Sequence, residues 1–410
     1  MSPLPFSTPP SPSPTPSISP FHLHIDEQKL QDMKDLVRLS PLAKDCFETR
    51  DLHDRELGVT GEWMREAKRV WLGEWEWREH EAHINTFPQF QAAVPDDDDG
   101  AIFSIHFVAL FSERHDAIPL VFLHGWPGSF LEFLPLLAIL RKKYTPANLP
   151  YHIIVPSLPG YTLSSAPPVD RDWHIAATAR IIHKLVLQLG LREYVVQGGD
   201  IGAAIARTIA VSYAECKAVH LNYCQMARPA ALNNDTLLSP REQAGLARYN
   251  DFIETGTAYG RMHGTRASTI AHVLASSPLA LLAWLGEKFL AWSDVDPELD
   301  TILTAVSLYW LTDCFPTTVY PYRQDFAAGQ RPAGWFHGQA ELYVAKPLGF
   351  SHFPYEVAPL PRAWVETSGR LVSWREHEAG GHFAALERPG ELLGDVEEFL
   401  GEVWEGVKGA

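Results

Sequence analysis

The sequence contains few cysteines. Its 410 residues include four, Cys46, Cys216, Cys224 and Cys314, with no CxxC pair and no spacing typical of a metal site. This scarcity excludes a disulfide scaffold. It is typical of reduced thiols, so we expect a cytoplasmic protein.

Basic residues are outnumbered as well. The chain has 34 Lys and Arg residues against 50 Asp and Glu residues, which gives a formal net charge of −16. No cluster of basic residues interrupts this excess. An acidic chain gains no attraction to a phosphate backbone, so nucleic-acid binding is excluded as an expected function.

The chain also lacks a recognisable targeting or membrane segment. Residues 1–20 are rich in Pro, Ser and Thr but have neither a basic nor an apolar signal region, so we predict a disordered tail and no membrane anchor. The only stretch of membrane length without formal charge, residues 267–286, contains His272 and a Ser-Ser-Pro break. We interpret it as buried helices of a soluble protein.

Alternating elements form the recognisable core of the sequence. Short β-type runs at residues 102–107, 120–123, 153–155 and 194–196 are separated by helical stretches. Such alternation predicts an α/β fold, with a mostly parallel sheet and helices on both faces. The alternation stops after Cys224 and resumes at residues 341–345 and 369–374, which indicates a helical lid inserted into the core. Residues 391–407 are predicted to form an amphipathic closing helix.

We therefore expect one catalytic domain with appendages. After the tail of residues 1–20, a tryptophan-rich N-terminal meander over residues 21–105 would wrap the core. The core would span residues 106–225 and 336–410, with the lid over residues 226–335. Within the meander, Asp96 to Asp99 lack the ligand spacing of a calcium loop, and we predict a solvated turn there.

Residues 198–202, Gly-Gly-Asp-Ile-Gly, join an apolar run to a helical stretch. This order of strand, tight turn and helix is the layout of a nucleophile elbow, in which small residues let the chain lift one reactive side chain over a helix N-terminus. The raised side chain here is Asp200. A carboxylate attacks sp³ carbon to form an alkyl ester, so an epoxide or alkyl halide is the expected substrate. The alternative is an ordinary glycine-rich turn with Asp200 as helix N-cap.

A second motif, His-Gly-Trp-Pro-Gly-Ser at residues 124–129, directly follows the predicted strand 120–123. Its glycines leave backbone N–H groups free to face a ligand. Together, the N–H groups of Trp126 and Ile201 could form an oxyanion hole for a tetrahedral ester intermediate. The alternative is a turn used only for packing.

A third motif, Gly-Gly-His-Phe, contains His382 just past the predicted strand 369–374. A histidine at this position could act as the base that activates water. Along the chain, hydrolases of this kind have the nucleophile first, then the acid and then the histidine, and His382 fits this order. Its local rival is His377. Glu356, beyond the predicted strand 342–345, could orient His382 and stabilise its charged form. The alternatives for this acid are Glu341, Asp325 and Asp313.

Together these stretches resemble the epoxide hydrolases of the α/β-hydrolase superfamily, in the branch of the mammalian microsomal enzyme and the soluble fungal enzymes. The resemblance covers roughly residues 20–405. It rests on residues 77–90, the 124–129 and 198–202 motifs, Pro-Gly-Tyr at 159–161 and GGHFAALERP at 380–389. Several motifs in one order are far more specific than any single motif.

The resemblance implies roles for named residues. Asp200 would be the nucleophile, His382 the base and Glu356 its charge partner. Two lid tyrosines that hold the epoxide oxygen match Tyr259 and Tyr322, with Tyr320 as a rival for Tyr322. No metal or organic cofactor is implied.

The sequence departs from part of the family at two points. The membrane anchor of microsomal members is absent, so the resemblance is to the soluble fungal type. The charge-partner position carries glutamate where other relatives have aspartate, which changes the reach and pKa of the acid.

We therefore predict hydrolysis of epoxides to vicinal diols, as in detoxification. The expected partners are a small lipophilic epoxide and water. Whether the protein forms a homodimer is left open. The lid tryptophans Trp284, Trp292 and Trp310 would make the pocket hydrophobic or belong to the plain core. A haloalkane dehalogenase is the alternative enzyme and would need halide-holding N–H donors; a serine hydrolase would need a serine at the elbow. A non-catalytic binder of small hydrophobic ligands would need none of the three catalytic groups.

Overall fold

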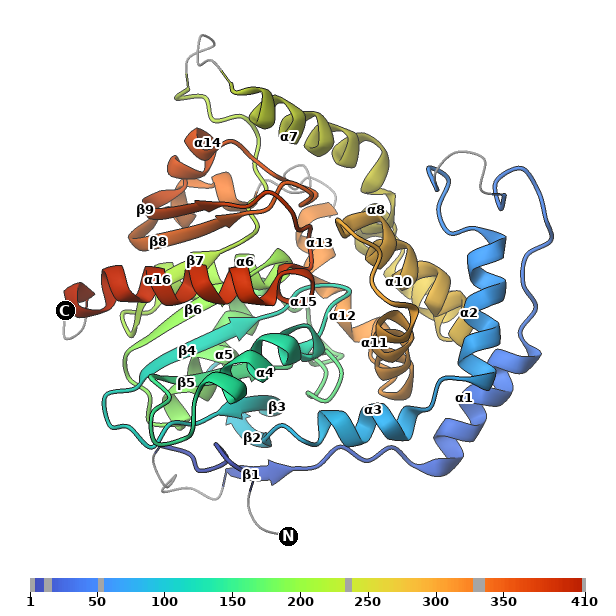
Figure 1. The fold of residues 1–410 in the computed structure, drawn as a ribbon, viewed down its shortest axis with the longest axis horizontal. Helices are drawn as coiled ribbons and strands as arrows, with labels where there is room; N and C mark the ends of the chain where they lie inside the picture. Colours follow the sequence, from blue (N-terminus) through green and yellow to red (C-terminus); the bar gives the residue numbers. More distant parts are fainter. Residues whose placement is uncertain (1–3, 11–16, 51–54, 233–237, 327–335, 408–410) are drawn as a thin grey trace.

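The centre of the molecule is a nine-stranded sheet with the strand order β1-β2-β3-β5-β4-β6-β7-β8-β9 (Figure 1). The computed structural model describes residues 4–10, 17–50, 55–232, 238–326 and 336–407. The strands are β1 (Ile18–Phe21), β2 (Gln89–Pro95), β3 (Ile102–Leu110), β4 (Ile118–Leu123), β5 (Tyr151–Pro156), β6 (Tyr194–Gly198), β7 (Cys216–Leu221), β8 (Val344–His352) and β9 (Gly369–Glu376).

The pairing confirms the predicted, mostly parallel sheet. Strands β1, β2 and β3 pair antiparallel, as do β3 and β5. Every pair from β5–β4 to β8–β9 is parallel. Phe122 of β4 lies beside Gln197 of β6, and Leu123 beside Gly198. The loops that follow β4 and β6 therefore meet at the same edge of the sheet.

Helices cover both faces of this sheet, as the alternation predicted (Figure 1). Helices α4 (Leu134–Lys143), α15 (Ala384–Glu387) and α16 (Pro389–Val407) contact one another, and α16 also contacts β7 and β8. On the other face, α6 (Asp200–Ser212) contacts β4, β6, β7 and β8, and α5 (Ile175–Gln188) packs on α6. The closing helix α16 buries a stripe at helical spacing, which includes Leu392, Val396, Phe399 and Val403. The short helix α14 (Arg362–Glu366) contacts β9.

The lid lies between β7 and β8, and its regular elements in the described residues are helical. They are α7 (Pro240–Asp251), the π-helix η2 (Phe252–Gly256), α8 (Ala258–Thr265), α9 (Ala267–Leu274), α10 (Pro278–Trp292), α11 (Leu299–Leu311), α12 (Phe315–Thr318), α13 (Tyr320–Phe326) and the 3₁₀ helices η3 (Phe336–Gly338) and η4 (Ala340–Leu342). Helix α8 packs on α13, and α10 packs on α11. The insertion begins at the carboxyl end of β7, at the same edge of the sheet as the turns after β4 and β6.

The uncharged stretch of the lid lies in α9 and α10. Within the described ranges, no single helix is long and apolar enough to cross a membrane; α9 and α10 together have the length and composition, but are bent by 116°. Leu281, Leu282 and Leu285 of α10 are buried, and α10 contacts α11 and two N-terminal helices, α1 (Glu27–Leu39) and α2 (Gly61–Gly73). The interpretation as buried helices is confirmed for α10, whereas α9 leaves Val273 half exposed.

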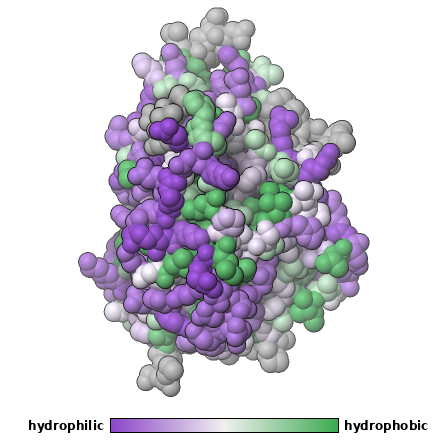
Figure 2. All heavy atoms as spheres, turned by 90° about the vertical axis from the view of Figure 1, so that its right-hand side faces the viewer, coloured by the Kyte–Doolittle hydropathy of each residue, from purple (hydrophilic) through white to green (hydrophobic). Residues whose placement is uncertain are grey.

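The tryptophan-rich N-terminal segment packs on the lid. Helices α1, α2 and α3 (Trp77–Ile84) all contact α11. Trp71 donates its indole N–H to Ser307 Oγ at 3.1 Å, and Trp75 donates to Thr304 Oγ1 at 3.3 Å. The outer face on this side of the molecule is largely hydrophilic, with hydrophobic side chains gathered near its middle (Figure 2). These tryptophans therefore bind the N-terminal segment to the lid.

The predicted disordered tail is wrong where the structure describes it. Ile18–Phe21 pairs with β2, and Phe6 is buried and accepts a backbone hydrogen bond from Phe111 N–H at 3.0 Å. The free edge of the β2–β3 hairpin offers backbone partners that composition does not reveal, and an edge strand tolerates proline. Residues 1–3 and 11–16 of that tail lie outside the described residues.

The solvated acidic turn is wrong for Asp96. This side chain is buried and accepts hydrogen bonds from Arg180 of α5 at 2.8 and 3.1 Å. The other three aspartates form ion pairs, Asp97 with Lys184, Asp98 with Arg180 and Asp99 with Arg171. Cations of distant segments therefore neutralise a cluster that the sequence shows only as a charge run.

The strand predicted at residues 341–345 is displaced. Ala340–Leu342 is a 3₁₀ helix, and β8 runs from Val344 to His352. Strands β2 and β7 were missed. Glutamines and a proline weaken the β pattern of β2, and Lys217 and His220 weaken that of β7. Both segments form strands because they pair with neighbouring strands of the sheet.

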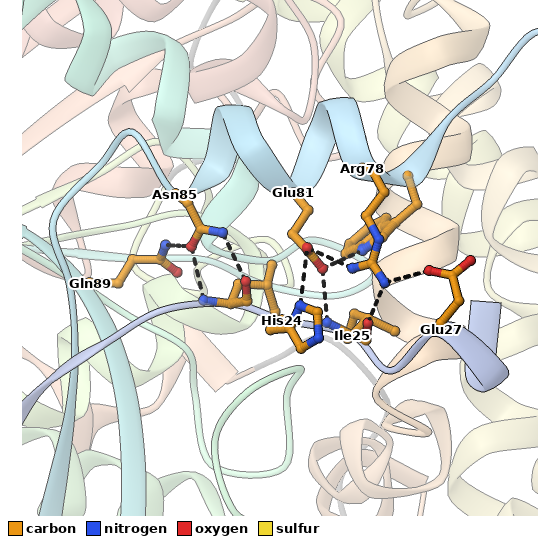
Figure 3. A network of polar contacts seen from close by, with 9 residues as sticks. His24, Ile25, Glu27, Arg78, Glu81, Asn85 and Gln89 are labelled. Atoms are coloured by element: carbon orange, nitrogen blue, oxygen red, sulfur yellow. Dashed lines mark hydrogen bonds and ion pairs between the residues drawn. The ribbon is translucent and has the colours of Figure 1, made fainter. Parts of the chain in front are cut away.

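Helix α3 anchors the chain that enters the meander (Figure 3). Asn85 binds the backbone of Leu23 twice, since its Oδ1 accepts from the N–H at 2.9 Å and its Nδ2 donates to the carbonyl at 2.8 Å. Gln89 donates to the same Asn85 Oδ1 at 3.1 Å. These contacts hold an extended segment against a helix without a regular ladder.

Glu81 is the buried acid of this network (Figure 3). Its carboxylate accepts from Ile25 N–H at 2.8 Å, from the Trp77 indole at 2.9 Å and from Arg78 at 2.7 Å. Burial alone would raise the pKa of Glu81, but these hydrogen bonds hold it below its usual value. The charged form is therefore the one that the fold stabilises.

Replacement of Glu81 should cost stability. In Glu81→Ala the buried donors lose their acceptor, and we expect a loss of about 3–5 kcal/mol in the free energy of unfolding, measured by urea denaturation. The pKa of Glu81 is lower in the folded than in the unfolded state, so this difference should shrink as the pH falls below roughly 4.3. Glu79→Ala, exposed on the same helix, is the matched control and should cost less than about 1 kcal/mol. Equal losses in the two variants would contradict the assignment.

Candidate active site

The tight turn between β6 and α6 carries Asp200. Its φ is 47°, in the left-handed region that residues other than glycine rarely adopt. A Cβ on Gly202 would lie 2.2 Å from the carbonyl oxygen of Leu123, and one on Gly198 would lie 2.3 Å from that of Gly202. The structure thus has the sharp elbow geometry that the motif predicts. The N-cap alternative is wrong, because Gly199 is the N-cap of α6 and no side chain forms a capping hydrogen bond there.

The turn after β4 reaches the same carboxylate. Trp126 donates its backbone N–H to Asp200 Oδ1 at 2.8 Å. A Cβ on Gly125 would lie 2.2 Å from that oxygen, so only glycine allows this close approach. Ile201 lies in the first turn of α6, where backbone N–H groups have no acceptor within the helix. The turn after β4 therefore donates a hydrogen bond to Asp200 and is not used only for packing.

His382 stands between two carboxylates. Its Nδ1 lies 2.6 Å from Glu356 Oε1, and its Nε2 lies 3.4 Å from Asp200 Oδ2. The side chains of His382 and Glu356 are buried. Glu356 comes from the loop after β8 and His382 from the loop after β9, so the parallel sheet brings both to the edge that carries the elbow.

The rival residues lie elsewhere. His377 Nε2 is 2.7 Å from Asp395, away from the elbow. Asp313 is exposed and pairs with Lys29, and Glu341 is exposed on η4. The side chain of Asp325 lies outside the described residues.

The two carboxylates dominate the electrostatics of His382. Burial alone would lower the pKa of the imidazole, but the negative charges and hydrogen bonds of Glu356 and Asp200 raise it well above its usual value. The imidazole is therefore held in its charged form while Asp200 is ionised. Loss of the Asp200 charge would remove one of the two causes that raise this pKa.

The lid places two phenols opposite the elbow. The rings of Tyr259 from α8 and Tyr322 from α13 lie 5.6 Å apart at 77°, and Tyr259 stacks on Trp126 at 5.1 Å. Burial raises the pKa of Tyr322 well above its usual value, so this phenol keeps its proton. Tyr320 points elsewhere, because its hydroxyl lies 2.7 Å from Thr178 Oγ1.

A pocket of about 100 Å³ joins these groups. Its lining includes Asp200, Ile201, Tyr259, Trp292, Tyr322 and His382. Of the three lid tryptophans proposed as pocket residues, Trp292 faces this cavity, whereas Trp284 donates to His263 Nε2 at 3.0 Å and Trp310 packs partly buried against the core. The pocket brings together the predicted nucleophile, the predicted base and the two phenols, whereas Trp126 and Glu356 do not line it.

Sequence reasoning missed two charged residues near this pocket. Lys288 is buried in α10 with its Nζ 4.7 Å from the centre of the Tyr259 ring. Glu132 lies beside the turn after β4 and reaches the rear of the elbow. A charged residue inside an apolar run was the available signal for Lys288. Among the described residues, no group of three or more His, Cys, Asp or Glu side chains could hold a metal ion.

Two family models match the chain. The model described as "Epoxide hydrolase N terminus" matches residues 18–133, and the one described as "alpha/beta hydrolase fold" matches residues 118–251. A relative from Dothistroma septosporum is 44% identical over 385 residues, covering 93% of this chain and 89% of the relative. Epoxide hydrolase 1 of Oryctolagus cuniculus is 29% identical over 426 residues, covering 94% and 89%.

Solved structures give the same result. The epoxide hydrolase of Aspergillus niger is 47% identical, with a TM-score of 0.91 over 98% of this chain and 100% of that chain. The juvenile hormone epoxide hydrolase of Bombyx mori is 26% identical, with a TM-score of 0.82 over 95% of each chain. The expected α/β-hydrolase fold is confirmed.

The charge of Asp200 should set the protonation of His382. In Asp200→Asn, which keeps the shape of the side chain and tolerates positive φ, we expect the pKa of His382 to fall, because one of the two carboxylates that raise it is gone. Titration of the imidazole by NMR measures this pKa in the parent and the variant. Asp395→Asn, beside His377, is the control and should leave the His382 titration unchanged. An unchanged titration in Asp200→Asn would contradict the electrostatic coupling.

Proposed function

The chain belongs to the epoxide hydrolase family and hydrolyses epoxides, and we propose that it does so through a covalent ester on Asp200. The observation that supports this mechanism is the surroundings of one carboxylate. A backbone N–H binds its Oδ1, a carboxylate-bound imidazole faces its Oδ2, and two phenols share its pocket. Each group meets a separate need of a two-step hydrolysis.

In the first step, Oδ2 of Asp200 attacks a ring carbon of the epoxide. Oδ1 stays bound to the Trp126 N–H, so the free oxygen is the one that faces the substrate. The departing oxygen is a poor leaving group as a bare alkoxide. Tyr259 and Tyr322 donate hydrogen bonds to it, and one of them donates the proton.

In the second step, His382 removes a proton from water, which attacks the Asp200 ester. Esterification removes the Asp200 charge that held the imidazole in its protonated form, so His382 gives its proton to the phenolate left by the first step and becomes free to act as a base. Glu356 stabilises the imidazolium that forms. The N–H groups of Trp126 and Ile201 hold the developing oxyanion on Oδ1.

The other candidate functions have less support. A haloalkane dehalogenase would need halide-holding N–H donors where this pocket has two phenols. A serine hydrolase would need a serine where the elbow carries Asp200. A non-catalytic binder of small hydrophobic ligands would not need a carboxylate, a histidine and an acid in hydrogen-bonded order.

Several finer features stay predictions. A pocket of about 100 Å³ lined by Trp292 and the two phenols suits a small lipophilic or aryl epoxide as the lid is placed. The cytoplasmic location, the lack of a membrane anchor and a homodimer likewise stay predictions from the sequence.

Replacement of the proposed nucleophile and base should separate the two steps. With aryl and alkyl epoxides, Asp200→Ala should form neither ester nor diol. His382→Gln should form the ester and then stall, because no base activates water. Intact-protein mass spectrometry after rapid mixing detects the ester as an increase equal to the mass of the epoxide, and chromatography detects the diol. Diol from Asp200→Ala would contradict the role of Asp200.

The tyrosines can be tested as a set of three. Tyr259→Phe and Tyr322→Phe should each slow ester formation about 10²-fold, because each removes a donor to the departing oxygen. Tyr320→Phe is the matched control, since its hydroxyl binds Thr178 and does not face the pocket. Single-turnover ester formation is the measurement. A larger loss in Tyr320→Phe than in Tyr322→Phe would reverse the assignment.

A further inference from the structure

A buried lysine of the lid lies over one of the two phenols. Lys288 is on α10, and its Nζ is 4.7 Å from the centre of the Tyr259 ring. The rings of Trp284 and Trp292 are also near, at 5.7 and 5.9 Å from the same atom. An ammonium group over the face of an aromatic ring is attracted by the electrons of that ring. Three rings therefore replace much of the water that would surround this cation in solution.

A neighbouring carboxylate supports the charged form of Lys288. Its Nζ lies 2.6 Å from Glu287 Oε1. Burial lowers the pKa of Lys288, and the charge and hydrogen bond of Glu287 oppose that lowering. The side chain of Glu287 is 37% exposed, whereas that of Lys288 is 5% exposed. Because water and salt screen the exposed charge more than the buried one, Tyr259 experiences mainly the positive member of the pair.

A titratable neighbour of the same phenol stays neutral. His263 follows Tyr259 by one turn of α8, and the two rings lie 5.4 Å apart. Burial, together with the charge of Lys288, lowers the pKa of His263 to about 3. Its Nε2 accepts the indole N–H of Trp284 at 3.0 Å, as only a neutral imidazole can. Of His263 and Lys288, only the lysine therefore brings a positive charge to Tyr259.

The second phenol has different surroundings. Among the described residues, no ammonium or guanidinium group lies over the ring of Tyr322. Burial raises the pKa of Tyr322 well above its usual value, and a hydrogen bond with Tyr259 acts in the same direction. Tyr322 therefore holds its proton more tightly than an ordinary phenol does.

We propose that Lys288 is a positioning residue that makes Tyr259, rather than Tyr322, the phenol that gives its proton to the departing epoxide oxygen. This inference rests on the proposed ester mechanism. A phenol that loses its proton becomes negatively charged, and part of that charge spreads over the ring. The ammonium group stabilises this charge through the ring face. It does so without contacting the substrate, since Lys288 does not line the substrate pocket.

The proton transfers balance without another reactant. Oδ2 of Asp200 bonds to a ring carbon, the carbon–oxygen bond breaks, and the departing oxygen takes the hydroxyl proton of Tyr259. His382 then gives its proton to the Tyr259 phenolate. In the second step His382 takes one proton from water and passes it to Oδ2, which leaves as the second hydroxyl of the diol. The other water proton returns His382 to its charged form and leaves Asp200 ionised.

Lys288→Met tests the role of the charge. Methionine has a similar length and suits a buried position, so the variant should fold. We expect ester formation to slow about tenfold, because the phenolate loses its stabilising cation. Ester hydrolysis should stay within about twofold of the parent, since Tyr259 is protonated again by then. Rapid-quench mass spectrometry of a single turnover measures both rates, and parental ester formation would overturn the proposal.

A double-mutant cycle separates this role from packing. In Tyr259→Phe, addition of Lys288→Met should not slow ester formation further, because that ring has no proton to give. In Tyr322→Phe, the same addition should still slow it about tenfold. Equal slowing in both backgrounds would reduce Lys288 to a packing residue. Slowing only in Tyr259→Phe would assign the proton to Tyr322 and overturn the proposal.

The basicity of the departing oxygen provides a second test. Propylene oxide and its trifluoromethyl analogue differ in this property, because fluorine withdraws charge from the oxygen. The less basic oxygen needs less help from a proton donor. The loss of ester formation in Lys288→Met should therefore be smaller with the trifluoromethyl analogue. An equal loss with both epoxides would contradict a role in proton donation.

Lys346→Met is the matched control. Lys346 is partly buried on β8 and donates to the carbonyl of Tyr213 at 2.6 Å, and neither residue lines the substrate pocket. Both rates should stay at the parental value in this variant. The ester mechanism is tested separately, because absence of any ester in His382→Gln would overturn that mechanism. An ester that forms at the parental rate in Lys288→Met would overturn only the role of Lys288.

Discussion

The structure depends on one carboxylate held in a strained turn. Asp200 has a φ of 47°, which costs of the order of 1–2 kcal/mol for a residue with a Cβ. The cost is sustained because the backbone around it cannot relax, with Gly198, Gly202 and Gly125 all packed where a Cβ would collide. The parallel pairing of β4 with β6 keeps both turns together, so the large sheet sets the position of a single side chain.

The protonation state of His382 depends on the charges of the neighbouring carboxylates. Glu356 holds His382 in its protonated form together with Asp200, and this arrangement is stable only while Asp200 is ionised. In the proposed mechanism, formation of the ester removes the Asp200 charge and lets His382 act as a base.

More of the candidate site than of the surrounding fold could be predicted from the sequence. The glycine pattern about Asp200, the Gly-Gly-His-Phe motif and the alternation of strands carry local signals, and they sufficed for the elbow, for His382 and for the α/β class. Tyr259 and Tyr322 came only from the resemblance. Strands β1, β2 and β7, the buried Asp96 and the position of Glu132 depend on partners distant in sequence, and no local pattern marks them.

The N-terminal segment takes part in the site through the lid. Trp71 and Trp75 hydrogen-bond to Ser307 and Thr304 of α11, and Tyr309 of the same helix donates to the carbonyl of Gly128 at 2.8 Å. That carbonyl belongs to the turn whose Trp126 N–H binds Asp200. One helix therefore joins the meander to the turn that donates to Asp200. This connection gives a physical reason for the wrapping segment, whose described residues do not line the substrate pocket.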